Sequence, residues 1–334
     1  MNYNNIDFNN KTILITGGAG FIGSNLVFYF QENFPNAKIV IFDCFRNEGL
    51  FSNGNLKSYG HYKNLIGFKG DLICGNLNSK ADLSKIKQYD FDFIFHHAAI
   101  SDTRVYDQEV VFQTNINSFY DLLEIAKKDS ATMVYASSAA TYGNLPAPQN
   151  VGSESPDNPY GFSKLIMDQI AHRYSEENPA MIIVGLRFFN VYGNREFYKA
   201  KTSSMIIQLG LQILNGDRPR LFKNSDEIYR DFIFIEDVIQ ANIKACTPLK
   251  NGTYNIGTSI SRSFKDIVDI LQNELGTNLN IDYFTNPYSG YQSNTEANIS
   301  SSLKNIGFKP SFSLEEGIKA YLPEIIKLHG EKYI

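Results

Sequence analysis

The 334-residue sequence predicts an α/β fold in which a doubly wound parallel sheet is joined to a smaller α/β lobe. In the first half, short runs rich in β-branched and aromatic residues alternate with amphipathic stretches, which is the pattern of a parallel sheet. A glycine-rich segment links the first such run to the first amphipathic stretch. After Asn190 polar loops separate shorter elements, which indicates a second lobe built differently from the first.

The pattern places six strands and three long helices in the first 190 residues. The expected strands are residues 12–16, 38–42, 66–70, 91–96, 132–136 and 182–188. The expected helices are residues 21–33, 110–127 and 160–177. In the second of these, apolar residues recur close to the 3.6-residue helical period.

A further strand at residues 230–238 is expected to return to the sheet, so the two domains should be interleaved in sequence. The predicted division assigns residues 1–189 plus 231–258 to a dinucleotide-binding domain. Residues 190–230 plus 259–334 then form the substrate-binding domain.

Composition excludes several classes of protein. The formal charge of −4 shows no basic excess, which argues against a nucleic-acid-binding protein. Cys44, Cys74 and Cys246 are odd in number and form no C-x-x-C pair, so free thiols in a reducing compartment are expected. The sequence contains no signal peptide pattern and no apolar run of 18 residues, so a cytoplasmic protein without a membrane segment is predicted.

The first candidate site is the glycine-rich segment that follows the first strand. Gly18, Gly20 and Gly23 satisfy the G-x-G-x-x-G pattern, and Gly17, Gly20 and Gly23 satisfy G-x-x-G-x-x-G. The segment opens a helix, where the backbone can approach a pyrophosphate. Asp43 ends the second strand 20 residues after Gly23, where a carboxylate can bind the ribose of adenosine. This combination predicts a Rossmann dinucleotide-binding domain. The alternative is an ordinary strand-to-helix turn without a bound ligand.

The sequence leaves open whether the dinucleotide is NAD or NADP. Asp43 alone favours NAD, whereas Arg46 could stack on adenine and neutralise the 2′-phosphate of NADP. An arginine in a solvent-exposed loop explains Arg46 nearly as well.

The second candidate site is Tyr160 with Lys164, four residues apart and therefore on one face of a helix. A phenol has a reference pKa of about 10, and we expect the lysine ammonium to lower it toward neutrality, so that Tyr160 can accept a proton. Ser138 is expected at the carboxyl edge of the sheet, where its hydroxyl can bond the oxygen of an alcohol substrate. The pattern indicates oxidation of an alcohol beside a hydride carrier.

Together these motifs resemble the extended short-chain dehydrogenase/reductases that modify nucleotide sugars, within the NAD-dependent epimerase/dehydratase family. The resemblance covers nearly the whole chain, and within the superfamily it is strongest to the ADP-L-glycero-D-manno-heptose 6-epimerases. Its most specific segments are Ala136-Ser-Ser-Ala-Ala-Thr-Tyr-Gly143, Gly185-Leu-Arg-Phe-Phe-Asn-Val-Tyr-Gly193 and Arg195-Glu-Phe-Tyr-Lys199.

The resemblance implies a role for each matching residue. The implied catalytic residues are Ser138, Tyr160, Lys164 and Lys199. The implied cofactor-binding residues are Gly17, Gly20, Phe21, Ile22, Gly23, Asp43, Cys44, Arg46, Asp71, Leu72, His97, Ala98, Ala99, Asn115, Tyr160, Lys164 and Val191. The implied substrate-binding residues are Ser101, Asn190, Lys201, Gln208, Phe222, Arg230 and Tyr291. No metal site is expected, because His96 and His97 are adjacent on a strand and face opposite sides.

Lys199 decides the type of reaction that the resemblance implies. In the heptose epimerases a lysine at this position is a second acid/base across the pocket from the tyrosine; without the resemblance, Lys199 would be interpreted as a solvated loop residue. Sugar dehydratases of this fold carry an Asp-Glu pair where this chain has Ala139 and Ala140, so elimination of water is not expected.

The resulting hypothesis is an NADP-dependent epimerase, with NAD left open as the cofactor. It would invert C6 of ADP-D-glycero-β-D-manno-heptose through a transient 6-ketone, supplying a precursor of lipopolysaccharide. The alternatives are a UDP-hexose 4-epimerase or a GDP-heptose enzyme, which would not need Lys199, and, more distantly, a non-catalytic dinucleotide sensor. The expected partner is a nucleotide sugar, with no nucleic acid or membrane, and the resemblance implies a homo-oligomer such as a pentamer.

Overall fold

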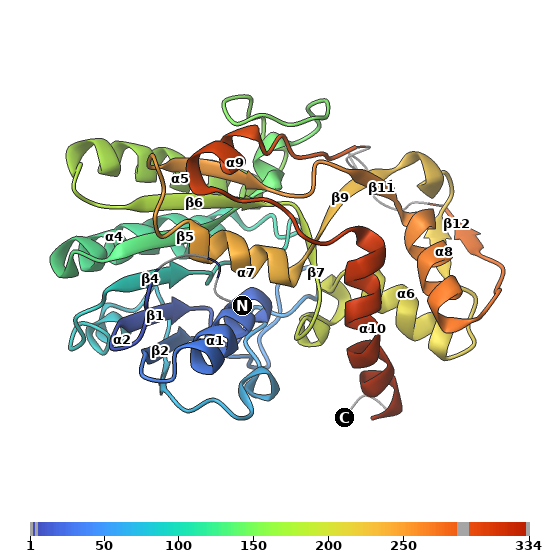
Figure 1. Ribbon diagram of the computed structural model, residues 1–334, viewed down its shortest axis with the longest axis horizontal. Helices are drawn as coiled ribbons and strands as arrows, with labels where there is room; N and C mark the ends of the chain where they lie inside the picture. Colours follow the sequence, from blue (N-terminus) through green and yellow to red (C-terminus); the bar gives the residue numbers. More distant parts are fainter. Residues whose placement is uncertain (1–2, 4–5, 286–293, 332–334) are drawn as a thin grey trace.

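The computed structural model describes residue 3, residues 6–285 and residues 294–331. A seven-stranded parallel sheet forms one side of the molecule and a lobe of helices and short strands forms the other (Figure 1). The order of the strands in the large sheet is β10-β6-β5-β4-β1-β2-β3. They are β1 (Thr12–Thr16), β2 (Lys38–Asp43), β3 (Asp71–Cys74), β4 (Phe93–His96), β5 (Thr132–Ser138), β6 (Ile183–Phe188) and β10 (Gly252–Ile256).

Helices cover both faces of this sheet, because alternate residues of each strand point to opposite faces and both sets are apolar. Ile13 and Ile15 of β1 belong to one buried cluster and Leu14 belongs to another. Helices α1 (Phe21–Asn33) and α7 (Ile235–Lys244) contribute to the first cluster. The second cluster includes residues of α2 (Lys80–Ser84), α4 (Ser118–Asp129) and α5 (Pro159–Glu177). The predicted doubly wound α/β sheet is confirmed.

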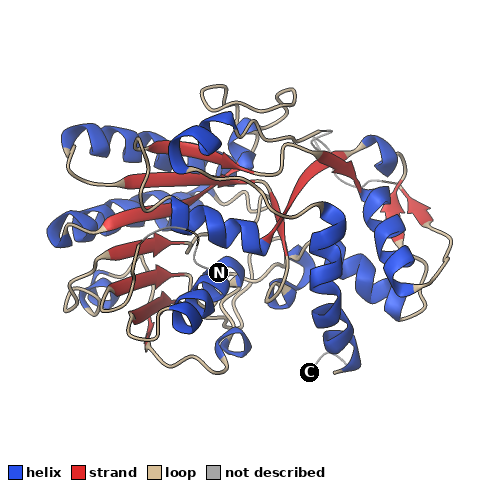
Figure 2. Cartoon of the chain, viewed as in Figure 1, coloured by secondary structure: helices blue, strands red, loops and turns tan. Residues whose placement is uncertain are grey.

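The second lobe contains two small sheets and a group of packed helices, seen on the right of Figure 2. Its strands are β7 (Asn190–Tyr192), β8 (Arg220–Phe222), β9 (Tyr229–Phe234), β11 (Ser261–Ser263) and β12 (Asp282–Phe284). Its packed helices are α6 (Met205–Leu214), α8 (Phe264–Leu275) and α10 (Leu314–Gly330), while the short α9 (Ser300–Ile306) contacts β10. None of the helices in the described ranges combines the length and apolar character needed to cross a bilayer.

Several predicted strands and helices lie where the sequence placed them. Helix α1 has the predicted bounds, and β1, β2, β4, β5, β6 and α5 differ from them by two residues or fewer at each end. The helix expected over residues 110–127 runs from Gln108 to Asp129 as α3 (Gln108–Phe112), one wider π-helical turn and α4.

The strand predicted at residues 66–70 is wrong. Ile66 is 70% exposed and Gly67 has a φ of 91°, so this segment turns on the surface and the strand begins at Asp71. Strand β3 forms the edge of the sheet with half-exposed side chains, and an edge strand of this kind lacks the continuous apolar run of a buried one.

The strand predicted at residues 230–238 does not return to the large sheet. Strand β9 pairs with β7 and β11 in a three-stranded sheet, and α7 follows it directly. The strand that completes the large sheet is β10, next to β6. The large sheet therefore does include a strand that follows the first elements of the second lobe in the chain. The exact division of the chain into two interleaved domains stays a prediction.

A buried ionic network lies beneath the carboxyl ends of β5 and β6. Arg187 is 2% exposed, and its guanidinium donates to Asp168 at 2.9 Å, to Tyr142 Oη at 3.0 Å and to the Glu154 carboxylate. Ser137 Oγ also donates to Asp168, at 2.9 Å. Because Ser137 adjoins Ser138, the network fixes the strand end that carries the predicted catalytic serine.

We expect Arg187→Met to lower the free energy of unfolding by about 3–5 kcal/mol, because it leaves the buried carboxylate of Asp168 and the partly buried one of Glu154 without their cation. Urea unfolding followed by circular dichroism measures this loss. The matched control is Arg220→Met, whose ion pair with Asp282 at 3.2 Å is on the surface. The control should cost less than about 1 kcal/mol. Equal losses in the two variants would contradict the assigned role of the network.

Candidate functional site

The glycine segment forms a tight turn at the N-terminus of α1. Gly17 has a φ of 71°, and its carbonyl accepts the N–H of Gly20 at 3.0 Å. A Cβ on Gly23 would lie 2.2 Å from Gly17 O, and a Cβ on Gly17 would lie 2.7 Å from Ala98 N. The turn therefore requires these glycines and leaves the backbone N–H groups at the start of α1 open to an anion, as a dinucleotide pyrophosphate needs.

Asp43 stands beside this turn at the end of β2. Its Oδ2 accepts the N–H of Ala19 at 3.0 Å and its Oδ1 accepts the N–H of Phe45 at 2.9 Å. The side chain is 6% exposed, and burial raises its pKa despite these bonds. A carboxylate held in this way at the second strand of a Rossmann fold is placed to bind ribose hydroxyls. The turn and this carboxylate both fit a nicotinamide dinucleotide.

A cavity of about 360 Å³ extends from the glycine turn to the ends of β4 and β5. It opens where the strand order reverses between β1 and β4, the usual ligand site of an open α/β sheet. Sixteen predicted site residues line it: Gly17, Gly20, Phe21, Ile22, Gly23, Asp43, Cys44, His97, Ala98, Ala99, Ser101, Ser138, Tyr160, Lys164, Val191 and Lys199. The structure thus gathers all four predicted catalytic residues and most of the cofactor set in one place.

Ser138, Tyr160 and Lys164 meet because α5 packs closely against the turn that follows β5. A Cβ on Gly161 would lie 2.3 Å from Ala140 O, so glycine is required at this contact. Helix α5 begins at Pro159, and the Asn158 side chain caps it by accepting the N–H of Gly161 at 2.9 Å.

The protein groups alone do not lower the pKa of Tyr160, so the expected lowering, which included the charge of an oxidised nicotinamide ring, stays a prediction. The Lys164 ammonium lies 5.9 Å from the centre of the Tyr160 ring and donates to Ala136 O at 2.7 Å. Burial raises the pKa of Tyr160, and a hydrogen bond with Ser138 opposes this only in part. Sequence spacing gave the shared helix face but could not show how strongly the surroundings desolvate the phenol.

Burial acts on the lysine as well. Lys164 is 1% exposed, and burial lowers its pKa to about 8 although Asp168 acts in the opposite direction. The ammonium is therefore a cation held in a poorly solvated site, next to the phenol that it is expected to assist.

Lys199 comes from the second lobe and reaches the same cavity. Its Nζ lies 5.5 Å from the centre of the Phe21 ring, at the first residue of α1. Burial lowers the pKa of Lys199, and the nearby Glu196 carboxylate partly opposes this. The side chain is thus directed into the cavity rather than into bulk solvent.

The segment that carries Lys199 packs against the loop that follows β2. Arg46 donates to Tyr198 O, and the His61 and Tyr198 rings stack with centres 4.0 Å apart. Arg195 donates to Asn64 O at 2.6 Å. Arg46 does not line the cavity but contacts the Lys199 segment, so its predicted contact with the cofactor phosphate stays a prediction.

Three other predicted cofactor residues also lie outside the cavity lining. Asp71 and Leu72 belong to the start of β3, because that strand begins later than predicted, and Tyr89 donates to Asp71 at 3.0 Å. Asn115 lies in the π-helical turn, is fully buried and bonds Ile100 O at 3.0 Å and Ser163 Oγ at 2.9 Å. Asn115 therefore holds residues next to the cavity in place without lining the cavity itself.

The late start of β3 places other residues at its carboxyl end. Gly75, Asn76 and Leu77 line the cavity, together with Lys57, Ser58 and Tyr59 from the preceding loop. The sequence analysis missed them. A correct placement of β3 would have identified the first three, because residues just beyond a parallel strand form the ligand edge.

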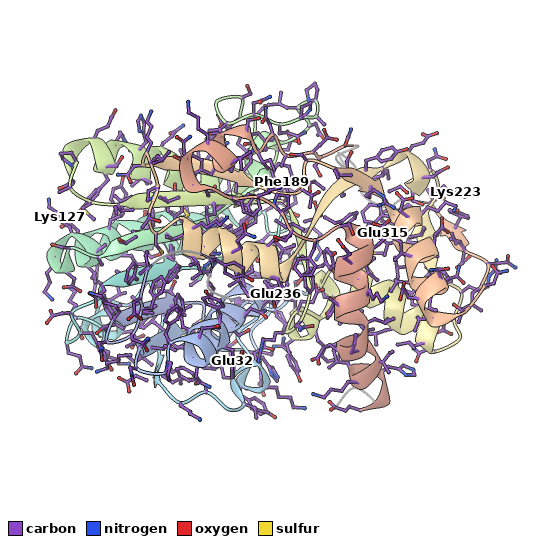
Figure 3. All side chains as sticks on the ribbon, in the orientation of Figure 1. Glu32, Lys127, Phe189, Lys223, Glu236 and Glu315 are labelled. Carbon is purple, nitrogen blue, oxygen red and sulfur yellow. The ribbon has the colours of Figure 1, made fainter. Side chains whose placement is uncertain are left out.

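Most predicted substrate residues lie beyond this cavity, in the second lobe. Asn190 is exposed at the start of β7, between the cavity-lining Phe189 and Val191; Figure 3 labels Phe189 where the large sheet meets that lobe. Lys201, Gln208, Phe222 and Arg230 lie on or near α6, β8 and β9 and do not line the cavity, and Tyr291 lies outside the described residues. Only Ser101 of this set reaches the cavity.

The histidines after β4 diverge, as the strand geometry predicts. His96 Nδ1 lies 2.7 Å from Thr16 Oγ1, whereas His97 Nε2 lies 3.0 Å from Asn242 Oδ1. Over the part of the chain that the structure describes, no three His, Cys, Asp or Glu side chains gather as metal ligands would.

A second cleft of about 930 Å³ lies among α1, α7, α10 and the back of the Lys199 segment. None of the predicted site residues lines it. The smaller cavity is therefore the candidate site, because it combines the glycine turn with Ser138 of β5 and with Tyr160 and Lys164 of α5.

A model of the NAD dependent epimerase/dehydratase family matches residues 13–257. The chain belongs to this family. Among solved structures it is similar to the ADP-L-glycero-D-manno-heptose-6-epimerase of Helicobacter pylori, at 48% identity and a TM-score of 0.90 over 98% of this chain and 99% of that one.

More distant similarity extends to two 4-epimerases. The UDP-N-acetylglucosamine 4-epimerase of Methanobrevibacter ruminantium M1 is 27% identical, with a TM-score of 0.83 over 95% of this chain and 98% of that one. The UDP-glucuronic acid 4-epimerase of Bacillus cereus, solved with UDP-glucuronic acid and NAD, is 28% identical, with a TM-score of 0.80 over 95% and 99%.

We expect Gly23→Ala to weaken binding of NAD⁺ and NADP⁺ at least about tenfold, because the new Cβ would displace the Gly17 carbonyl and open the turn. Isothermal titration calorimetry on protein freed of cofactor measures this change. Gly330→Ala is the control, since a Cβ there meets no atom within 4 Å. Unchanged affinity in Gly23→Ala would show that the turn does not hold the pyrophosphate.

The lowered pKa of Lys164 predicts a pH-dependent stability difference between the protein and Lys164→Met. Between pH 8 and 10.5 the unfolded lysine still holds a proton that the native one has lost, so the native protein gains stability relative to the variant as pH rises. The gain should be roughly 3 kcal/mol, from unfolding curves at the two pH values. A constant difference would contradict the burial of a charged amine.

Proposed function

We propose that this chain is a nucleotide-sugar epimerase that inverts C6 of ADP-D-glycero-β-D-manno-heptose to give the L-glycero epimer. The observation that carries the proposal is the placement of Lys199, which lines the same cavity as Ser138, Tyr160 and Lys164 but comes from the other lobe. The name of the Helicobacter pylori relative supports the heptose substrate, since nearly the full length of both chains is covered at 48% identity.

The first half of the proposed reaction uses β5 and α5. A nicotinamide dinucleotide bound along the glycine turn would supply the hydride acceptor and donor. Tyr160 accepts the proton of the C6 hydroxyl, and Ser138 bonds the same oxygen as it becomes a carbonyl. Burial disfavours the phenolate in the chain alone, so the Lys164 ammonium and the cationic ring of the oxidised cofactor must together favour it.

The second half uses Lys199. Rotation about the C5–C6 bond turns the other face of the 6-ketone toward the place where a bound nicotinamide would return the hydride. Lys199 then donates a proton to the oxygen from its own side of the cavity, and proton exchange with solvent would restore the Tyr160 phenolate and the Lys199 ammonium for the next cycle. Its lowered pKa makes it a stronger acid than a solvated lysine, which suits this transfer near neutral pH. The sequence of steps leaves no net redox change.

We propose NADP as the cofactor, with NAD as the alternative. NAD is supported by Asp43 at the adenosine ribose and by the NAD in the Bacillus cereus relative. The argument for NADP from Arg46 is weakened, because that guanidinium is used by Tyr198. Exposed Lys57, which lines the cavity, is a cation that could face a 2′-phosphate.

The product would be a precursor of the lipopolysaccharide core, made in the cytoplasm by a homo-oligomer. These three statements follow from the substrate proposal and the family resemblance. A 4-epimerase of a UDP-hexose or an enzyme of a GDP-heptose is the alternative for the substrate. It would use Tyr160 and Lys164 in the same way but would have no need of Lys199.

We expect Lys199→Met to reduce epimerisation at least about a hundredfold, because one proton donor is lost, while the content of bound cofactor stays unchanged. Proton NMR of ADP- and UDP-linked sugars in deuterated buffer follows inversion at each carbinol carbon. Lys319→Met, on the exposed side of α10, is the control and should turn over normally. Full activity of Lys199→Met on an ADP-heptose would refute the role of Lys199. Inversion of a UDP-hexose at C4 would favour the alternative.

A further inference from the structure

Glu196 is a fully buried carboxylate that the proposed proton transfers do not use, although it precedes Lys199 by three residues. Its Oε1 accepts the N–H of Gly193 at 3.2 Å and the hydroxyl of Ser204 at 2.7 Å. Its Oε2 accepts the N–H of Ser204 at 2.6 Å. One carboxylate therefore ties together both ends of the segment 193–204, which carries Lys199 between them.

This segment needs such an anchor because its backbone is strained. Arg195 has a φ of 72° and Ala200 a φ of 53°, in the left-handed region that favours glycine. Each of these conformations is disfavoured for a residue with a side chain and persists only where surrounding contacts enforce it. The two strained residues flank the stretch that holds Glu196 and Lys199. Without an anchor, the strain would favour a different path for the chain.

Other hydrogen bonds within the same segment fix the backbone at Lys199 itself. The N–H of Lys199 donates to Glu196 O at 2.9 Å, and the Thr202 hydroxyl donates to Lys199 O at 2.8 Å. Both peptide groups next to the lysine Cα are therefore held. The Lys199 side chain therefore extends from a fixed backbone position to the face of the Phe21 ring.

Charge gives a second link between the two residues. Burial lowers the pKa of Lys199 and the Glu196 carboxylate raises it, while the lysine in turn lowers the pKa of Glu196 against its own burial. The phenols of Tyr321 on α10 and Tyr192 on β7 face the same carboxylate, which contributes to their raised pKa values. Within the described residues, Lys199 makes no ion pair closer than 4.0 Å, so its charge is supported but not neutralised.

We propose that Glu196 is a positioning residue for Lys199: its carboxylate closes the segment 193–204 and supports the ammonium charge in the cavity. The inference rests on the proposed function, because that function gives Lys199 its role. The rival explanation is that Glu196 only stabilises the fold of the second lobe.

Glu196→Gln separates the two explanations, because it keeps the size of the side chain and removes the charge. Two measurements are made across pH: kcat for epimerisation, and competitive acetylation of Lys199 by acetic anhydride, read by mass spectrometry. Removing the carboxylate should move the half-point of acetylation toward lower pH, because the lysine loses a nearby negative charge. The high-pH limb of kcat should move the same way. We expect kcat to fall at least about tenfold, with KM and cofactor content within about threefold.

Three further variants make the outcome decisive. Glu196→Asp keeps the charge and should restore the acetylation half-point toward that of the native protein. Asp237→Asn removes another buried carboxylate, which accepts the N–H groups of Ser311 and Phe312, and should lower Tm without moving the half-point. Adding Glu196→Gln to Lys199→Met should cause no further loss of kcat, since both act through one group.

An unchanged acetylation profile in Glu196→Gln, or losses that multiply in the double variant, would overturn the proposal. If Glu196→Gln does not fold, the kcat of Glu196→Asp decides, because the shorter side chain keeps the charge but cannot bridge Gly193 and Ser204. A kcat equal to that of the native protein would then overturn the proposal. Acetylation needs no sugar, so it still tests the positioning role if the native protein fails to epimerise an ADP-heptose. That failure would remove the proposed function alone.

Discussion

The close approach of helix α5 to the turn after β5 is the contact on which the site depends. It is possible because Gly161 has no side chain where a Cβ would lie 2.3 Å from Ala140 O. This contact brings the N-terminal turn of α5 to the strand end that carries Ser138. Asn158 caps the helix at that point, so Tyr160 and Lys164 enter the cavity from a helix with a fixed start. The ionic network around Arg187 holds the same strand end from below.

Burial then sets the chemistry of the groups that this contact assembles. Lys164 and Lys199 both have lowered pKa values and Tyr160 a raised one, so the apolar surroundings disfavour every charge that catalysis requires. The nearby carboxylates Asp168 and Glu196 offset this for the two lysines only in part. A bound dinucleotide would add the positive ring charge that the phenol lacks.

Much of this arrangement could be predicted from the sequence, because the decisive features are local. The glycine turn, Asp43 and the Tyr160–Lys164 spacing follow from short patterns with a direct physical meaning, and they lie together in one cavity. The predicted position of the edge strand β3 was wrong because its half-exposed side chains give no apolar run. For the same reason Asn76 and Leu77, which follow β3 and line the cavity, were not predicted as site residues. Segments that depend on long-range packing were less predictable. Neither the contact of Arg46 with Tyr198 nor the buried role of Asn115 is visible without the fold.

The contacts between the loop after β2 and the Lys199 segment have a consequence for the order of events. Arg46 and His61 belong to the loop that borders the adenosine end of the cavity, yet both rest on Tyr198, next to Lys199. Moving that loop far enough to exchange a dinucleotide would also release the segment that bears the lysine. If a dinucleotide binds along the cavity as proposed, its exchange would therefore also displace Lys199 from the opposite side of the cavity.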